Sequence, residues 1–359
     1  MKKLLIVCIF PFFLAGCGRD ASQLTVVTAI GVDGIPGAYQ IDTEVIRLTD
    51  SDQNSQSVLL QSDGRTVSDG IDSLVSATGR SLYCNHAQVL IVGRNTAEAD
   101  LAILLEEILR VNQYPLSLRV AVAKGTASEL LQAKAVVSDL HSTELEDMLR
   151  EGAAQCLTAD MTVSSFYQDM RDEGIEGILP FLELREDHGQ LICTLGGTLL
   201  FRDDTPLTVL NREDSATLMW MRGKSGGTLM TDYGLLEVTY LDRKLEANAD
   251  GAKLTIKLTR TAAGSEDNKA ALVAEAEQLL EYRCRNLIAR MQSLECDAVG
   301  FGQQLRRQHL LTWNALPQPW EQQFPNYPIQ VDVTVETVIW GRIWREEDTL
   351  LSKEDLNGT

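Results

Sequence analysis

Basic residues are scarce in this sequence. Its 359 residues include 32 lysines and arginines against 51 aspartates and glutamates, which gives a formal net charge of −19. Such a chain repels phosphate groups, so the charge argues against nucleic acid as the main partner. It also repels anionic lipid headgroups, and any attachment to a membrane must therefore use something other than a basic surface patch.

Long apolar runs are absent after the first seventeen residues. No later segment has eighteen consecutive apolar residues, so we expect no membrane-spanning helix in the mature chain. The composition, 44% hydrophobic and 23% charged, is that of a folded globular protein and excludes disordered and collagen-like chains. At about 150 residues per domain, the length predicts two to three domains.

The N-terminus reads MKKLLIVCIFPFFLAGC and has the layout of an export signal. Lys2 and Lys3 form a positive region, and the apolar stretch from Leu4 to Leu14 is about half of the ~20 residues that span a bilayer. Leu14-Ala15-Gly16-Cys17 resembles the lipobox of bacterial lipoproteins, which implies cleavage before Cys17 and a diacylglyceryl group on its thiol. The alternative is a conventional signal peptide that contains a cysteine by chance.

Cysteine pairs and histidine clusters are also missing. After removal of Cys8 with the signal and lipidation of Cys17, the remaining cysteines are odd in number and have no C-x-x-C spacing. We therefore expect most of them to be buried small hydrophobes rather than parts of a disulfide framework. No histidine lies within ten residues of another, so the sequence predicts no metal site and no other cofactor. These cysteines are Cys84, Cys156, Cys193, Cys284 and Cys296, and the histidines are His86, His141, His188 and His309.

Two motifs match catalytic or metal-binding patterns only in part. Asp50-x-Asp52-x-Asn54 begins like an EF-hand loop but lacks its glycine and its bidentate glutamate. Gly223 to Gly227 reads G-x-S-x-G, but a helix precedes it and a strand follows it, which is the reverse of a nucleophile elbow. We therefore predict a polar loop over 50–64, a glycine-rich loop before a strand at 223–227, and no catalytic residue.

Hydrophobic periodicity predicts an α+β protein with mixed or antiparallel sheets flanked by helices. Five tryptophans gather towards the C-terminus, either in the core or on a partner-binding surface; they are Trp220, Trp313, Trp320, Trp340 and Trp344. The predicted strands are 24–33, 38–49, 86–93, 116–125, 191–201, 228–241, 252–261 and 329–340. The predicted helices are 66–79, one through Leu101 to Leu109, several within 126–173, one at 212–222 and the longest at 268–295.

The pattern changes between Pro180 and Gly189, where we place a domain boundary. The predicted organisation is a signal peptide at 1–16, an N-terminal region at 17–185 and a C-terminal region at 186–359. A further division of the last region would give three domains overall.

Several stretches in order resemble the C subunits of spore germinant receptors, the Ger(x)C lipoprotein family. After the lipobox, these are LTVVTAIGVDG (24–34), GRSLYCNHAQVLIVG (79–93) with His86 at the family's histidine position, LRVAVAKGTASELL (118–131), 196–223, 297–316 and 328–342. One departure is Cys17-Gly18-Arg19-Asp20, since family members commonly carry Trp-Asp soon after the lipidated cysteine. This departure concerns contacts beside the membrane rather than the fold.

The resemblance implies a lipid anchor at Cys17 on the outer face of the spore inner membrane. It also implies three mixed α/β domains, a complex with integral-membrane A and B subunits that respond to amino acids, sugars or nucleosides, and no enzymatic activity. Two alternatives stay open at this point. One is an extracytoplasmic solute-binding lipoprotein associated with a membrane transporter, for which parallel sheets are typical, and the other is a secreted hydrolase.

Overall fold

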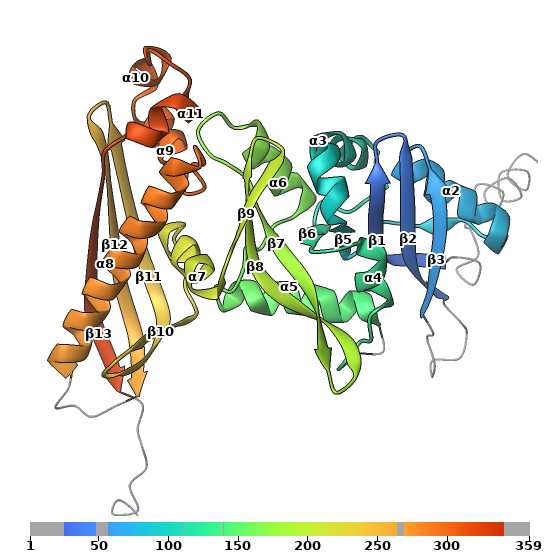
Figure 1. The fold of residues 1–359 in the computed structure, drawn as a ribbon, viewed down its shortest axis with the longest axis horizontal. Coiled ribbons are helices and arrows are strands. Elements are labelled where there is room, and N and C mark those ends of the chain that lie inside the picture. The colour runs from blue at the N-terminus through green and yellow to red at the C-terminus, as the bar shows by residue number, and fades with distance from the viewer. Residues whose placement is uncertain (1–24, 48–56, 112, 139, 264–268, 341–359) are drawn as a thin grey trace, which may run out of the picture.

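The computed structural model describes residues 25–47, 57–111, 113–138, 140–263 and 269–340. Two sheets lie along the long axis of the molecule, each covered by helices (Figure 1). One cluster of buried hydrophobic side chains runs from Val27 in the first sheet to Val335 in the second. The predicted α+β class, with mixed sheets flanked by helices, is confirmed.

The first sheet begins with an antiparallel meander of β1 (Thr25–Ile35), β2 (Ala38–Arg47) and β3 (Ser57–Gly64). The predicted hairpin is confirmed, because Ile35 pairs with Ala38 across the turn. The prediction of a loop over 50–64 is wrong for β3. This strand lies at the sheet edge and has no fully buried residue, so its sequence carries no apolar alternation that would reveal it.

The centre of this sheet is parallel. β5 (Val89–Val92) and β6 (Arg119–Ala123) follow β1 in the sheet, and β4 (Leu82–Tyr83) pairs with β1 separately. All four residues of β5 are buried, as predicted from its continuous apolar run. The helices α2 (Val67–Thr78) and α3 (Arg94–Arg110) bring apolar faces to the same core, with Ile71, Leu101 and Leu104 fully or almost fully buried.

Helices α4 (Ala127–Gln132), α5 (His141–Ala154) and α6 (Val163–Arg171) confirm the predicted helical region. The sheet then continues through β7 (Ile178–Asp187), β8 (Gln190–Arg202) and β9 (Thr205–Leu210). The predicted boundary between residues 185 and 186 falls inside β7, which pairs with β8 along its whole length. Because one sheet continues past this point, the division into structural domains stays a prediction.

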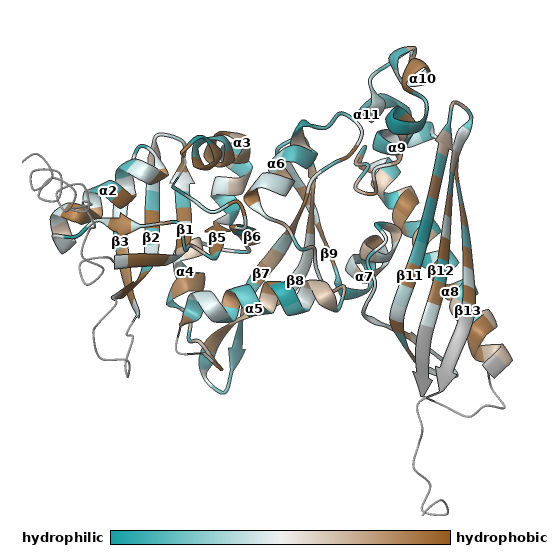
Figure 2. Cartoon of the chain, turned by 180° about the vertical axis from the view of Figure 1, so that it is seen from behind, coloured by the Kyte–Doolittle hydropathy of each residue, from teal (hydrophilic) through white to brown (hydrophobic). Residues whose placement is uncertain are grey.

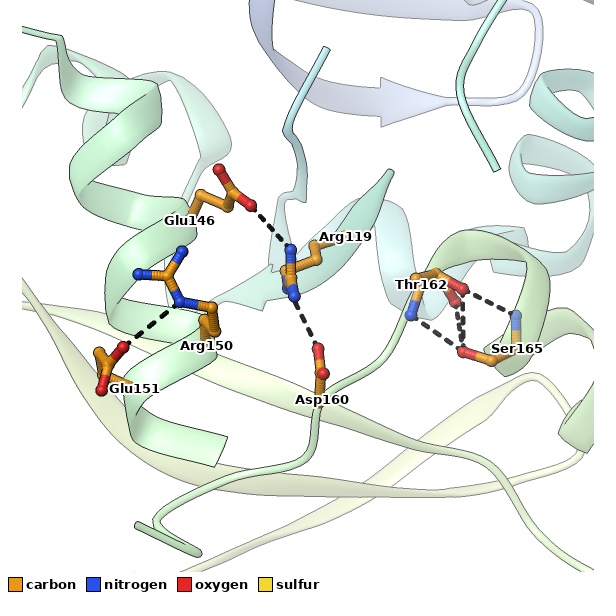
Figure 3. A network of polar contacts seen from close by, with 7 residues as sticks. All are labelled: Arg119, Glu146, Arg150, Glu151, Asp160, Thr162 and Ser165. Carbon is orange, nitrogen blue, oxygen red and sulfur yellow. Dashed lines mark hydrogen bonds and ion pairs between the residues drawn. The ribbon is translucent and has the colours of Figure 1, made fainter. Parts of the chain in front are cut away.

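A network of polar contacts connects α5 to the centre of the first sheet (Figure 3). Arg119 of β6 donates to Glu146 of α5 at 2.9 Å and to Asp160 at 3.1 Å. Thr162 and Ser165 close a capping box at the start of α6, with Ser165 N donating to Thr162 Oγ1 at 3.1 Å. These bonds fix the chain that leads from α5 into α6.

The second sheet has the strand order β10 (Thr228–Thr231), β11 (Gly234–Asn248), β12 (Gly251–Ala263) and β13 (Ile329–Trp340), and α7 (Arg212–Met221) precedes it. The single strand predicted over 228–241 is wrong, because Asp232 and Tyr233 form a turn between β10 and β11. Hydrophilic and hydrophobic residues alternate along β11 and β12 (Figure 2), as expected of strands with one buried face.

The long helix α8 (Lys269–Ser293) packs on the second sheet and connects β12 to β13, which are parallel. A parallel pair needs such a crossover connection. The predicted stripe of α8 is confirmed where its side chains are buried, as for Leu272, Leu280 and Met291. Three short helices and a single 3-10 turn follow: α9 (Phe301–Gln308), α10 (Leu310–Asn314), α11 (Trp320–Gln323) and η4 (Phe324–Asn326).

All five of these cysteines are buried free thiols, which confirms the prediction that most of them are buried. Trp220 and Trp320 belong to the core, Trp313 is partly buried against it, and Trp344 lies outside the described residues. Among the residues that the structure describes, no helix is both long and apolar enough to cross a membrane.

Candidate functional site

Two predicted features lie outside the described residues. They are Cys17, the predicted site of lipid attachment, and the polar segment Asp50-x-Asp52-x-Asn54. Lipidation of Cys17 therefore stays a prediction from the sequence.

Asp33, in the GVDG stretch at the end of β1, fastens that strand to α4. Its Oδ1 and Oδ2 accept hydrogen bonds from Ala127 N and Ser128 N, both at 2.9 Å, at the start of that helix. Burial raises the pKa of Asp33, while these two bonds act in the opposite direction. The carboxylate thus has a structural role between two elements that are distant in the sequence.

The four histidines lie on four separate segments of the chain. His86 is exposed beside Tyr83, with 5.6 Å between their ring centroids. His141 is buried at the start of α5, where its Nε2 lies 2.8 Å from Leu130 O, while His188 and His309 are exposed. Within the described ranges, no group of three or more histidine, cysteine, aspartate or glutamate side chains is placed to hold a metal ion.

The glycine-rich loop at 223–227 lies between α7 and β10, as predicted. Ser225 Oγ accepts a hydrogen bond from Leu241 N at 3.0 Å, and Trp220 Nε1 donates to Gly226 O at 2.8 Å. A β-carbon on Gly226 would lie 2.0 Å from Ala154 O, at the end of α5. The loop therefore needs glycine because two backbones approach closely there.

A buried carboxylate organises the chain after α8. Both oxygens of Asp297 accept hydrogen bonds: Oδ1 from Gly300 N at 2.8 Å, and Oδ2 from Gly302 N at 2.8 Å and from Trp320 Nε1 at 3.0 Å. Burial raises the pKa of Asp297 against the opposing effect of these bonds. Trp320 in turn packs against Tyr327, with 4.9 Å between the ring centroids. Asp297 thus joins the start of α9 to an aromatic cluster.

Glu176 lies beside this centre, since its backbone N donates to Asp297 O at 2.9 Å. Its Oε2 accepts from Asp203 N at 2.8 Å, and its side chain is buried. Burial, reinforced by the charges of Asp203, Glu321 and Asp297, raises the pKa of Glu176 from 4.5 to about 8.

The raised pKa of Glu176 predicts a pH dependence of stability. The folded protein keeps this proton up to about pH 8, whereas the unfolded chain loses it near 4.5, so the contribution is complete below pH 4.5 and is lost as the pH rises through 8. Glu176→Gln cannot ionise, and we expect its free energy of unfolding to fall less than that of wild type across this range. Urea unfolding at several pH values measures the difference.

The control for this measurement is Glu98→Gln, because wild-type Glu98 is exposed and forms a surface ion pair with Arg94. We expect it to follow the wild-type pH profile. Identical profiles for Glu176→Gln and wild type would contradict the assignment of a raised pKa to Glu176.

The sequence predicted neither carboxylate of this centre, and of its other residues it singled out only Trp320, as a core or partner-binding residue. Asp297 and Glu176 lie on segments that only the fold brings together. One local signal was present in DAVGFG (297–302), where an aspartate precedes two glycines whose N–H groups it can bind at a helix start.

Comparison with known protein families shows to which family this chain belongs. Residues 18–184 match the model described as "Spore germination protein N-terminal domain", and residues 196–338 match "Spore germination B3/ GerAC like, C-terminal". The chain belongs to the GerAC-like family of spore germination proteins. The resemblance to germinant-receptor C subunits seen in the sequence is thereby confirmed.

A curated relative of this GerAC-like protein covers nearly the whole chain. It is the "Putative spore germination protein YfkR" of Bacillus subtilis (strain 168), which is 18% identical over 96% of this chain and 98% of its own. The solved structure titled "Crystal Structure of the GerBC protein" matches with a TM-score of 0.51 at 14% identity, over 86% of this chain and 96% of that one. At this identity the second match concerns the fold alone. Family membership favours spore germination over a solute-binding lipoprotein or a secreted hydrolase.

Proposed function

We propose that this protein is the lipid-anchored C subunit of a nutrient germinant receptor and acts in spore germination as a non-enzymatic interaction subunit. The observation that carries the proposal is the pair of family matches, which together extend from residue 18 to residue 338. The first match begins directly after Cys17, the residue at which the lipobox predicts lipidation.

Anchoring in this proposal depends on Cys17. Two acyl chains on one residue are enough for stable attachment to a bilayer, whereas a single chain gives only marginal binding. The attachment places the folded chain at the outer face of the spore inner membrane. A chain with a net charge of −19 has little electrostatic attraction to anionic lipid, so the acyl chains supply the affinity.

The partners in this proposal are the integral-membrane A and B subunits of the receptor. The hydrogen bonds of three polar groups support the non-enzymatic part of this proposal. Asp33 and Asp297 bind backbone N–H groups at helix starts, and Ser225 accepts a hydrogen bond from β11, so these groups act within the fold.

Anchoring is tested by replacing the lipidated residue. We expect Cys17→Ala to incorporate no alkyne-tagged fatty acid, because the thiol that receives the diacylglyceryl group is missing. The matched control is Cys8→Ala, the same substitution within the predicted signal, which is expected to label and to fractionate with membranes like wild type. Fatty-acid labelling of Cys17→Ala at the wild-type level would refute lipidation at this residue.

A further inference from the structure

A pocket of about 440 Å³ opens at the junction of the two sheets. Its walls come from the end of α6, the loop after α7, β11 and α9, so both sheet regions contribute to it (Figure 1). Ligand sites are frequent at such junctions, and this volume is within the range of small-molecule pockets. The charged residues in its lining are Asp169, Asp172, Arg222, Lys224, Arg243 and Arg307.

Both carboxylates of this junction pocket are already paired. Asp169 forms an ion pair with Arg222 at 3.1 Å. Asp172 accepts hydrogen bonds from Arg306 at 2.8 Å and from Gln303 at 3.0 Å. The negative charge in the lining is therefore neutralised by neighbouring groups.

The other three cations of the lining form no ion pair with a described residue. Among the described residues, no carboxylate oxygen lies within 4.0 Å of the charged groups of Lys224, Arg243 and Arg307, and these three side chains supply an excess of positive charge. Such a concentration of cations is unexpected in a chain that carries a net charge of −19. An anion that enters the pocket would meet this excess of positive charge.

Arg243 is the most confined of these cations. Its Nε is buried without a hydrogen-bond partner, and its Nη2 reaches Val299 O only at 3.5 Å. Burial lowers the pKa of Arg243, the neighbouring Arg222 lowers it further, and Asp297 acts in the opposite direction. The two oxygens of Asp297 accept their hydrogen bonds from Gly300, Gly302 and Trp320 rather than from Arg243.

We propose that this junction pocket binds a small anionic molecule through a carboxylate or phosphate group held by Arg243, Lys224 and Arg307. A guanidinium presents a planar set of N–H donors that matches two oxygens of one oxyanion, and an ammonium adds a point charge. Entry of the anion brings a negative charge beside the partly buried guanidinium of Arg243, whose Nη2 lies 3.5 Å from Val299 O. This site goes beyond the proposed receptor function and does not rest on it.

Calorimetric titration of the mature, full-length chain in detergent micelles tests this proposal at constant ionic strength. The probes are inorganic phosphate and succinate, with succinamide as the uncharged analogue. We expect saturable binding of phosphate, of succinate or of both, and none of succinamide. Binding of phosphate alone identifies a phosphate ligand, and binding of succinate alone identifies a carboxylate ligand.

Variants locate the site of binding. We expect Arg243→Gln to weaken binding at least tenfold. Because that residue is partly buried, the exposed pair Lys224→Gln and Arg307→Gln, combined in one chain, provides a second test that leaves the core intact. The control is Arg110→Gln, which removes an exposed arginine paired with Glu106 on α3 and is expected to bind like wild type. Absence of saturable binding by either anion, or unchanged binding in the Lys224→Gln, Arg307→Gln chain, would overturn the proposal.

Discussion

Asp297→Ala is expected to lower the free energy of unfolding by about 3–5 kcal/mol. The substitution leaves three buried donors, the N–H groups of Gly300, Gly302 and the Trp320 indole, without an acceptor. It also opens a cavity beside the aromatic cluster that contains Trp320 and Tyr327. The start of α9 then loses its connection to that cluster.

Urea unfolding followed by tryptophan fluorescence measures this loss, because Trp320 reports directly on the affected region. Asp297→Asn keeps the volume but replaces one accepting oxygen by a donor, so we expect a smaller loss of about 1–3 kcal/mol. Asp332→Ala is the control, since Asp332 forms a half-exposed ion pair with Lys253 and is expected to contribute less than about 1 kcal/mol. A loss for Asp297→Ala no larger than that of Asp332→Ala would show that the buried carboxylate does not organise this region.

The second large effect is expected for Gly226→Ala, with a loss of about 3 kcal/mol or more. Gly226 has φ +116, a conformation that strains any residue with a β-carbon, and the added carbon would lie 2.0 Å from Ala154 O. Relief of that clash must separate the loop after α7 from the end of α5. The hydrogen bond from Trp220 Nε1 to Gly226 O would be disturbed with it.

The variant Gly189→Ala separates the backbone strain from the clash with Ala154 O. Gly189 also has a left-handed backbone, with φ +76, but a β-carbon there meets no atom within 4 Å. We expect it to cost about 1–2 kcal/mol, which is the conformational strain alone. Chemical denaturation of both variants measures the difference, and equal losses for Gly226→Ala and Gly189→Ala would exclude the close approach as the cause.

Elements with a strong periodic pattern could be predicted from the sequence. The continuous apolar run of β5, the stripe of α8 and the alternation in β13 each reflect burial on a defined face, and burial is what hydrophobic periodicity reports. β3 could not be recognised, because an edge strand without a buried face has no such pattern. The turn at Asp232 and Tyr233 interrupts a run that is rich in β-forming residues on both sides. The composition therefore predicted one strand where there are two.

The junction pocket and the Asp297 centre could not be predicted for a different reason. Asp169, Arg222, Arg243 and Arg307 come from four separate segments, and the local patterns of one sequence do not show which distant residues meet. The export signal and lipobox are the opposite case. Their chemistry is read from contiguous residues by the processing enzymes, and for that reason Cys17 could be proposed without any structure.

The most direct test of the receptor-subunit proposal is release of dipicolinic acid from spores exposed to a panel of nutrients. The gene is deleted in a strain without its other germinant receptors, and the strain is complemented with wild type, Cys8→Ala or Cys17→Ala. We expect deletion to abolish the response to some nutrients, wild type and Cys8→Ala to restore it, and Cys17→Ala to leave it absent. Release at the wild-type rate from spores whose Cys17→Ala protein carries no lipid would contradict the account.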